Sequence, residues 1–270
     1  MKSLVYMGTL KGRAPRAAST ALAVALLMAV GACSDQIHLG SDPLAVDAAP
    51  APPYWFADFE TGNLSQWDEP AGGGGQILSS NAQLSVVTTP THSGQYAASS
   101  AIFAANGTSY ARLYRWGNLP NDLYYKVWMY IPQRYTIGLY WNVFEFQGRT
   151  NPADSTSYQY LWSLDLEQAS NGDMSWYLYD TPHGHKYLPT ATTVAPIGRW
   201  FLVEAFMHQA TDNTGRVTFW VDGALLFDVT GVSTEPTMWL SWNVGGSASN
   251  ITEPQAEIFL DDAAITLTGP

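Results

Sequence analysis

Apolar and polar residues alternate one by one along several short segments, and this period of two most limits what the chain can fold into. The segment YYKVWMYI at 124–131 places four apolar residues on one face, and its other face carries Lys126, Trp128 and Tyr130. The segment GRWFLVEAFMHQ at 198–209 alternates in the same way. Such segments are typical of β-strands with one buried face.

A third segment, WNVFEFQG at 141–148, sets Phe144 and Phe146 against Trp141, Glu145 and Gln147. Turn signals separate the alternating segments. Asp222-Gly223 suits a tight hairpin turn that needs positive φ. No long stretch shows helical periodicity, and about a dozen strands with turns roughly every 8 to 15 residues predict an all-β fold. We expect two antiparallel sheets packed as a jelly-roll sandwich.

The aromatic residues indicate what the free face of such a sandwich would bind. Tryptophan and tyrosine recur beside glutamate, glutamine and lysine on the polar sides of the expected strands. Exposed aromatic surface of this kind is costly unless a ligand covers it. Sugar rings suit it, because their apolar faces stack on aromatic rings while their hydroxyls form hydrogen bonds. We therefore expect polysaccharide as the partner.

Four segments resemble bacterial jelly-roll domains of the concanavalin A-like type. They are ADFETGNLSQW at 57–67, NVFEFQG at 142–148, the long segment at 196–223 and AEIFLDDAAI at 256–265. The segment at 142–148 resembles the glutamine-bearing central strand of the heparin lyase I-like and glucuronan lyase-like polysaccharide lyases. The order and spacing cover nearly all of residues 54–270. The resemblance implies a concanavalin A-like sandwich and a β-eliminating lyase acting on a uronate polymer.

The resemblance also implies roles for particular residues. Gln147 falls on the family's glutamine position and would neutralise a uronate carboxylate. The segment YLYDTPHGHKYLP at 177–189 holds two of the five histidines. His185 or His183 would act as the base, and Tyr187 or Tyr179 as the acid. We expect Gln147, His185 and Tyr187 to be the catalytic set.

The expected substrate-binding residues surround this set. Trp128 is the preferred stacking platform and Trp176 the second. The full expected group is Lys126, Trp128, Tyr130, Glu145, Arg149, Trp176, Tyr179, His183 and Lys186.

The chain departs from the lyase family's pattern at two places, and two other functions are considered. The family carries a tyrosine after a Val-Gly pair near the end, where this chain has Gly246 and Ser247. The histidine that often follows the family's glutamine is also absent. The chain could therefore be a non-catalytic carbohydrate-binding or adhesion domain. A hydrolase is disfavoured, because WSLDLEQ at 162–168 has Ser163 where laminarinase-like enzymes have a glutamate, and a retaining mechanism needs two carboxylates.

Four acidic residues near the ends of the domain suggest a metal site. Asp58 and Glu60 lie in the first expected strand, and Asp261 and Asp262 lie in the last. First and last strands of such domains often lie side by side. Grouped carboxylates repel unless a hard cation joins them, and Ca²⁺ prefers oxygen ligands. We expect a structural calcium ion, with separate exposed acids as the alternative.

The N-terminus is typical of export. Basic residues precede an apolar run at 17–30, which ends in Val30-Gly31-Ala32-Cys33. This resembles a bacterial lipobox, and Cys33 is the only cysteine. We expect residues 1–33 to be a lipoprotein signal ending at the lipidated Cys33, 34–53 to be a flexible tether rich in Ala, Pro and Asp, and 54–270 to be one domain.

The net charge of the mature chain limits the classes of partner that it can bind. Four of the 12 Lys and Arg precede Cys33, so the mature chain would carry eight against 23 acids, a net charge of −15. This argues against nucleic acid, which needs a basic face. It also weakens long-range attraction of a polyanion, unless the few cations gather in one groove. We expect a monomer in the bacterial cell envelope, at the outer membrane or cell surface, held only by its lipid.

Overall fold

β-Strands account for nearly all regular structure in the computed structural model, which describes residues 53–70, 73–103, 107–149, 151, 157–190, 194–234 and 239–269. These ranges contain fifteen strands and one short 3₁₀ helix, η1 (Ser65–Asp68). None of their helical structure is long and apolar enough to cross a membrane. The predicted signal segment and nearly all of the predicted tether, Cys33 included, lie outside the described residues.

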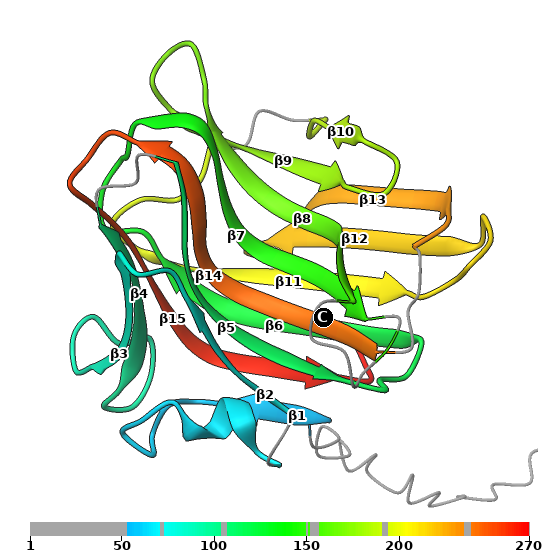
Figure 1. Cartoon of the computed structure of the whole chain (residues 1–270), viewed down its shortest axis with the longest axis horizontal. Coiled ribbons are helices and arrows are strands. Elements are labelled where there is room, and N and C mark those ends of the chain that lie inside the picture. Colours follow the sequence, from blue (N-terminus) through cyan, green and yellow to red (C-terminus); the bar gives the residue numbers. More distant parts are fainter. Residues whose placement is uncertain are drawn as a thin grey trace, which may run out of the picture. The chain divides into compact units, whose positions relative to one another are not determined.

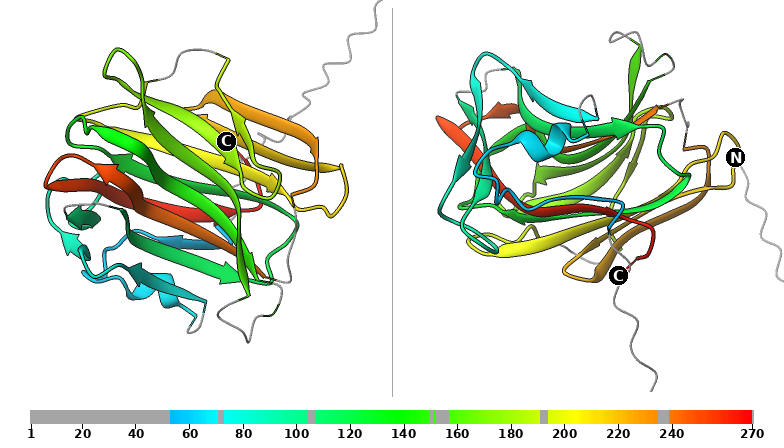
Figure 2. Two further views of the ribbon diagram at one scale, coloured as in Figure 1. Left: turned by 45° about the horizontal axis from the view of Figure 1, so that its top comes forward. Right: turned by 90° about the horizontal axis from the view of Figure 1, so that it is seen from below.

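The strands form two antiparallel sheets, as predicted (Figure 1). Sheet A has the order β13 (Ala224–Val232), β12 (Gly215–Val221), β11 (Trp200–His208), β6 (Asp122–Tyr130), β15 (Gln255–Thr266), β4 (Ala97–Phe103) and β3 (Ala82–Val87), with β1 (Trp55–Ala57) paired to β15. Sheet B has the order β10 (His185–Tyr187), β9 (Met174–Asp180), β8 (Tyr158–Gln168), β7 (Ile137–Arg149), β14 (Trp239–Ile251), β5 (Thr108–Gly117) and β2 (Gly74–Leu78). The two sheets pack face to face as layers of one sandwich (Figure 2).

The core lies between the sheets and is rich in aromatic rings. Trp242 on β14 is fully buried, and its ring centroid lies 5.4 to 6.1 Å from those of Trp55, Trp67, Tyr125 and Phe144. Trp55 and Tyr125 belong to sheet A, whereas Phe144 and Trp242 belong to sheet B. This cluster therefore joins the two sheets by apolar burial.

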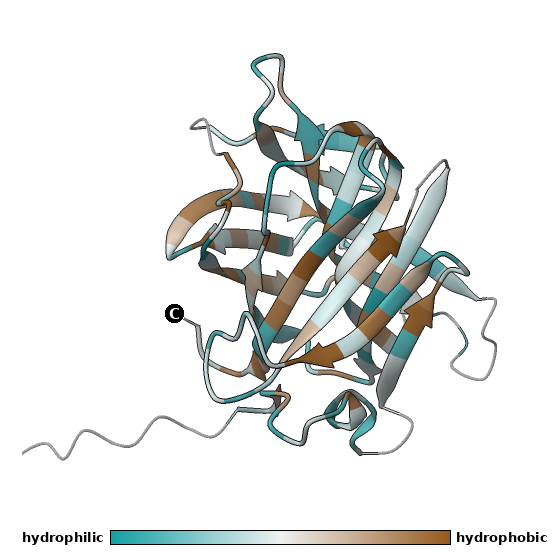
Figure 3. Cartoon of the chain, turned by 90° about the vertical axis from the view of Figure 1, so that its left-hand side faces the viewer, coloured by the Kyte–Doolittle hydropathy of each residue, from teal (hydrophilic) through white to brown (hydrophobic). Residues whose placement is uncertain are grey.

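The predicted alternation is confirmed in the strands that face this core. On β6, Tyr125, Val127 and Met129 are buried, and on β11 the residues 201, 203, 205 and 207 are buried. Bands of apolar and polar residues alternate along the strands in Figure 3. The hairpin between β12 and β13 turns at Asp222 and Gly223, both with positive φ, as the Asp-Gly pair predicted.

One alternation prediction is wrong because β7 contains a bulge. The register between β7 and β8 shifts between Asn142 and Phe144, which leaves Val143 as an extra residue. Trp141 therefore turns into the core, where it is 1% exposed, and does not share a face with Glu145 and Gln147. Asn142 takes the place on the outer face that was predicted for Trp141.

We predict that Trp242→Ala lowers the free energy of unfolding by about 3–5 kcal/mol, because it opens a cavity where both sheets meet. Denaturant unfolding followed by circular dichroism measures the change. Leu225→Ala, at a residue that is 60% exposed, is the control and should stay within about 0.5 kcal/mol of the parent. Equal losses in the two variants would contradict this account of the core.

Candidate functional site

A groove of about 880 Å³ crosses the face of sheet B that points away from sheet A. Its volume suits a ligand of several sugar rings or a drug-sized molecule. Five neighbouring strands, from β5 across β14, β7 and β8 to β9, supply almost all of the lining. Tyrosines form much of its surface, at positions 110, 114, 140, 158, 160, 177 and 179.

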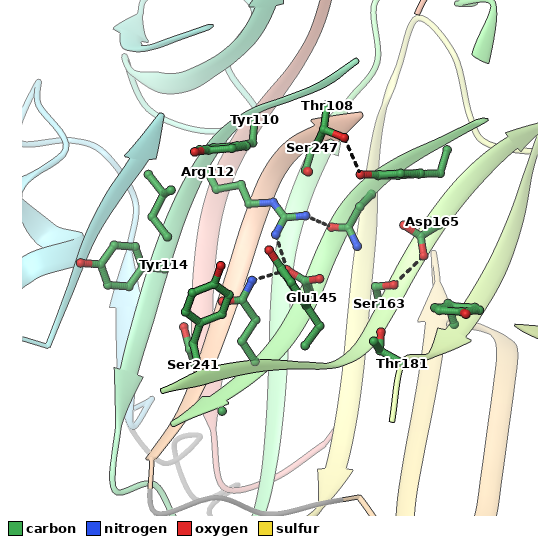
Figure 4. A pocket seen from close by; sticks show the side chains of 18 of the residues that line it. Thr108, Tyr110, Arg112, Tyr114, Glu145, Ser163, Asp165, Thr181, Ser241 and Ser247 are labelled. Atoms are coloured by element: carbon green, nitrogen blue, oxygen red, sulfur yellow. Dashed lines mark hydrogen bonds and ion pairs between the residues drawn. The ribbon is translucent and has the colours of Figure 1, made fainter. Parts of the chain in front are cut away.

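The floor of the groove is a hydrogen-bonded network around Glu145. Arg112 on β5 forms an ion pair with Glu145 on β7 through Nη1, and its Nη2 donates to Asn142 Oδ1 at 2.6 Å. Gln147 Nε2 donates to Glu145 Oε2 at 2.6 Å. Arg112 and Glu145 are each 5% exposed, so these donors hold a carboxylate in a largely dry setting (Figure 4).

A second carboxylate, Asp165 on β8, lies beside this network without an ion pair among the described residues. Ser163 Oγ donates to Asp165 Oδ2 at 2.6 Å, and Asp165 is 3% exposed. Burial raises the pKa of Asp165 to about 7, which outweighs the opposing effect of Ser163. This carboxyl group can therefore change its charge near neutral pH.

The walls of the groove carry exposed rings. Tyr158 and Tyr160 are 49% and 45% exposed, and their ring centroids lie 5.5 Å apart. Burial raises the pKa of Tyr160 to about 12, with the neighbouring Tyr158 as the next cause. Burial also raises the pKa of Tyr177, to which the charge of Asp165 adds. These phenols stay protonated at neutral pH and can donate hydrogen bonds.

Three cations line the groove, beside the carboxylates of Glu145, Asp165 and Glu167. Arg112, Arg149 and Lys186, three of the eight Lys and Arg that follow Cys33, line it. Lys186 forms an ion pair with Glu167, and Arg149 lies 4.0 Å from the ring centroid of Trp116. Binding of a polyanion would require the few cations to lie together in one groove. Three of them do, although two of the three have acidic partners.

Several predicted site residues do meet in this groove. Gln147 and Glu145 lie at its floor, and Arg149, Tyr179 and Lys186 also line it. The structure thus brings the predicted central strand and part of the 177–189 segment together. Of the predicted catalytic set, Gln147 alone lines the groove.

The histidine-bearing segment is a hairpin at the edge of sheet B, formed by β9, residues 181–184 and β10. His183 Nδ1 lies 2.8 Å from Asp180 Oδ2 and ties the turn together. On β10, Lys186 faces the groove, so alternation turns His185 and Tyr187 away from it. The predicted place of His185, Tyr187 and His183 in the groove is therefore wrong, because none of them is among its lining residues.

The predicted stacking platforms are also misplaced. Lys126, Trp128 and Tyr130 lie on β6, on the outer face of sheet A, and Trp128 stacks on His92 with ring centroids 3.8 Å apart. Trp176 is 1% exposed and packs against Phe201 in the core. The predictions that these four residues share the groove with Gln147 are wrong.

The four acids predicted to bind calcium lie just beyond the residues through which β1 and β15 pair, which are 55–57 and 263–265. They are engaged separately in holding loops. Asp58 Oδ1 accepts from Gln66, whereas Glu60 accepts from the backbone of Gln95 and Tyr96. Asp261 accepts from the backbone of His92, and Asp262 lies 2.6 Å from the His92 ring. Within the described ranges, no three acidic, histidine or cysteine side chains form a metal-binding group, so calcium stays a prediction.

Sequence reasoning missed Arg112, Asn142 and most of the tyrosines. A signal for Arg112 was present, because the segment SYARLYRW at 109–116 alternates and places Tyr110, Arg112 and Tyr114 on one face. Asn142 was hidden by the bulge. Asp165 and Glu167 alternate with apolar residues in WSLDLEQ, and both line the groove together with Ser163.

No family model matches the sequence, and no curated protein matches it. Solved structures do match. An endo-β-1,4-glucuronan lyase from the fungus Trichoderma reesei has a TM-score of 0.59 at 16% identity, covering 80% of this chain and 96% of that one. A PL-14 alginate lyase from Aplysia kurodai has a TM-score of 0.51 at 13% identity, covering 82% and 100%. A cellulose-induced protein has a TM-score of 0.52 at 16% identity, covering 79% and 97%.

At these identities the likeness concerns the fold alone. The predicted resemblance to the architecture of glucuronan and alginate lyases is confirmed at that level: the chain is a two-sheet antiparallel jelly roll of the kind these polysaccharide lyases have.

Proposed function

We propose that this protein binds a polysaccharide chain along the groove of sheet B. The observation that carries the proposal is the lining itself, with seven tyrosines around a floor of charged and amide groups. Rings such as Tyr158 and Tyr160 offer stacking surfaces to the apolar faces of sugars. Ser163, Asn142 and the phenolic hydroxyls offer hydrogen bonds to sugar hydroxyls.

The lyases named among the solved structures support this choice of ligand class by sharing the architecture. They are lyases of glucuronan and of alginate, which are acidic polymers. Arg112, Arg149 and Lys186 offer donors to the carboxylates of an acidic polysaccharide, although Glu145, Asp165 and Glu167 line the same groove.

A second proposed activity is β-elimination of a uronate polymer, and the floor network favours it. Arg112 and Gln147 already hold one carboxylate, that of Glu145. Arg112 has five N–H donors and uses two of them on Glu145 and Asn142. A uronate carboxylate bound to the remaining donors would lose part of its negative charge, which makes the proton on C5 easier to remove.

This chain lacks the tyrosine that the lyase family carries near its end, but another tyrosine lies close to that position and supports the same activity. Gly246 and Ser247 stand where that tyrosine would be, and Tyr110 on β5 pairs directly opposite Ser247 in the sheet. Both side chains line the groove (Figure 4). A phenol is therefore present next to the position from which it is missing on β14.

The proposed location rests on the N-terminal sequence alone. We propose that lipid on Cys33 anchors the protein in the bacterial cell envelope, and that Ca²⁺ adds to the stability of the region where β1 and β15 pair. The basic, apolar and lipobox-like segments support the anchor, and the acids at 58, 60, 261 and 262 support the ion.

For binding, we predict that the double substitution Tyr158→Ala and Tyr160→Ala weakens affinity for glucuronan or alginate oligosaccharides about tenfold or more, because two stacking surfaces are removed. Isothermal titration calorimetry measures the affinity. Tyr54→Ala is the matched control, since Tyr54 is 49% exposed and lies outside the groove. Unchanged affinity in the double variant, or an equal loss in the control, would remove the groove from the binding site.

For β-elimination, we predict that the purified protein raises ultraviolet absorbance when incubated with glucuronan or alginate, because each cut creates an unsaturated sugar. Gln147→Ala should lower the rate about 100-fold, by analogy with the loss of one donor to a developing negative charge. Gln83→Ala, on β3 of the other sheet, should keep the parent rate. Binding of both polymers with no absorbance change would leave a binding protein.

A further inference from the structure

We propose that Asp165 is the general base of the groove and that Tyr177, directly opposite it on β9, is the general acid. The inference rests on the β-elimination proposed above and names the groups that would move the proton. Asp165 pairs in register with Asn142 on one side and with Tyr177 on the other. All three side chains line the groove.

The isolation of Asp165 from cations is the first argument. Arg112 is engaged with Glu145 and Asn142, and Lys186 is engaged with Glu167. Within the part of the chain that the structure describes, no ion pair reaches Asp165, although it is 3% exposed. A buried carboxylate without a cation costs stability, so packing alone does not explain an aspartate at this position.

The protonation behaviour of the two groups is the second argument. Burial raises the pKa of Asp165 to about 7, so a large share of Asp165 is ionised at neutral pH and is a much stronger base than an ordinary aspartate. Burial also raises the pKa of Tyr177, so its hydroxyl keeps a proton to give. An unprotonated base and a protonated acid thus stand side by side.

The groups that surround Asp165 come from five strands. They are Arg112 on β5, Tyr140, Asn142 and Glu145 on β7, Ser163 and Glu167 on β8, Tyr177 and Tyr179 on β9, and Lys186 on β10. The charge of Glu145 raises the pKa of Asp165 further, and Arg112 and Asn142 oppose that effect. Ser163 donates its hydroxyl to Oδ2, and the side chain of Asn142 also hydrogen-bonds the Asp165 carboxyl group.

The reaction step balances with these two groups alone. Asp165 takes the proton from C5 of the uronate, and the electron pair of that C–H bond forms the C4–C5 double bond. The C4–O bond breaks, its electron pair stays with the leaving oxygen, and Tyr177 gives that oxygen its proton. The proton on Asp165 then passes to the Tyr177 phenolate, which restores both groups for the next cut.

The test compares the parent protein with Asp165→Asn and Tyr177→Phe on glucuronan and on alginate. We expect each variant to lose about 100-fold or more in kcat/KM, while calorimetric affinity for oligosaccharides stays within about threefold of the parent. The kcat/KM of the parent should rise with pH and level off above the Asp165 pKa of about 7. Asp122→Asn, at an exposed residue of β6, is the matched control and should keep full activity.

A stability measurement separates this role from a structural one. The pKa of Asp165 in the fold lies above its ordinary value of 3.8, at about 7, so its contribution to stability is complete below pH 3.8 and is lost as the pH rises through 7. Asp165→Asn should therefore raise Tm by about 2 °C or more at pH 8, and by less at pH 5. A lower Tm at pH 8 would mean that the carboxylate supports the fold, which overturns the proposal.

The remaining outcomes distinguish this proposal from the function on which it rests. If the parent forms unsaturated product and Asp165→Asn does so within tenfold, β-elimination stands and Asp165 is not its base. If the parent binds both polymers without forming product, or releases reducing ends without ultraviolet absorbance, the base assignment and β-elimination both fail while binding in the groove survives. If neither polymer binds, the groove proposal fails as well.

Discussion

The site depends on the two-sided character of sheet B, in which one face of every strand packs against sheet A while the other face is open. Strict alternation would put Trp141 into the groove and leave the core short of a large ring. The extra residue Val143 in β7 shifts the alternation, so that Trp141 fills the core and Asn142 reaches the floor. A bulge in the middle of a central strand weakens the hydrogen-bond ladder. Its effect here is to place an amide within reach of Arg112, which connects β5 and β7 across β14.

The floor of the groove holds two carboxylates, of which Glu145 forms an ion pair and Asp165 forms none among the described residues. Arg112 and Glu145 are both nearly inaccessible to water, and each offsets the desolvation cost of the other. Gln147 adds a hydrogen bond to the same carboxylate, so this part of the floor is rigid before any ligand arrives. Asp165 has no cation partner among the described residues. Burying this carboxylate without a cation costs stability.

Much of the fold could be predicted because strand alternation and turn residues act locally, as on β6 and at Asp222-Gly223. The assignment of polar faces to the groove could not be predicted, since a sandwich has two outer faces and alternation does not tell them apart. Trp128 and Gln147 both belong to outer faces, but on opposite sheets. The prediction for the histidine-bearing segment was wrong for a different reason. Strand β10 has only three residues, too few for its alternation to show that Lys186 points inward while His185 and Tyr187 do not.

The contrast between Glu145 and Asp165 explains how one sheet can supply two kinds of carboxylate. The two residues lie on neighbouring strands and line the same groove. Glu145 has an arginine and an amide as partners, which hold its side chain in one place. Asp165 has a serine hydroxyl, and burial raises its pKa to about 7. A carboxylate held like Glu145 can orient donors toward a substrate. A carboxyl group that gains and loses its proton near neutral pH, like Asp165, can transfer a proton. The difference arises from the partners that each strand position meets.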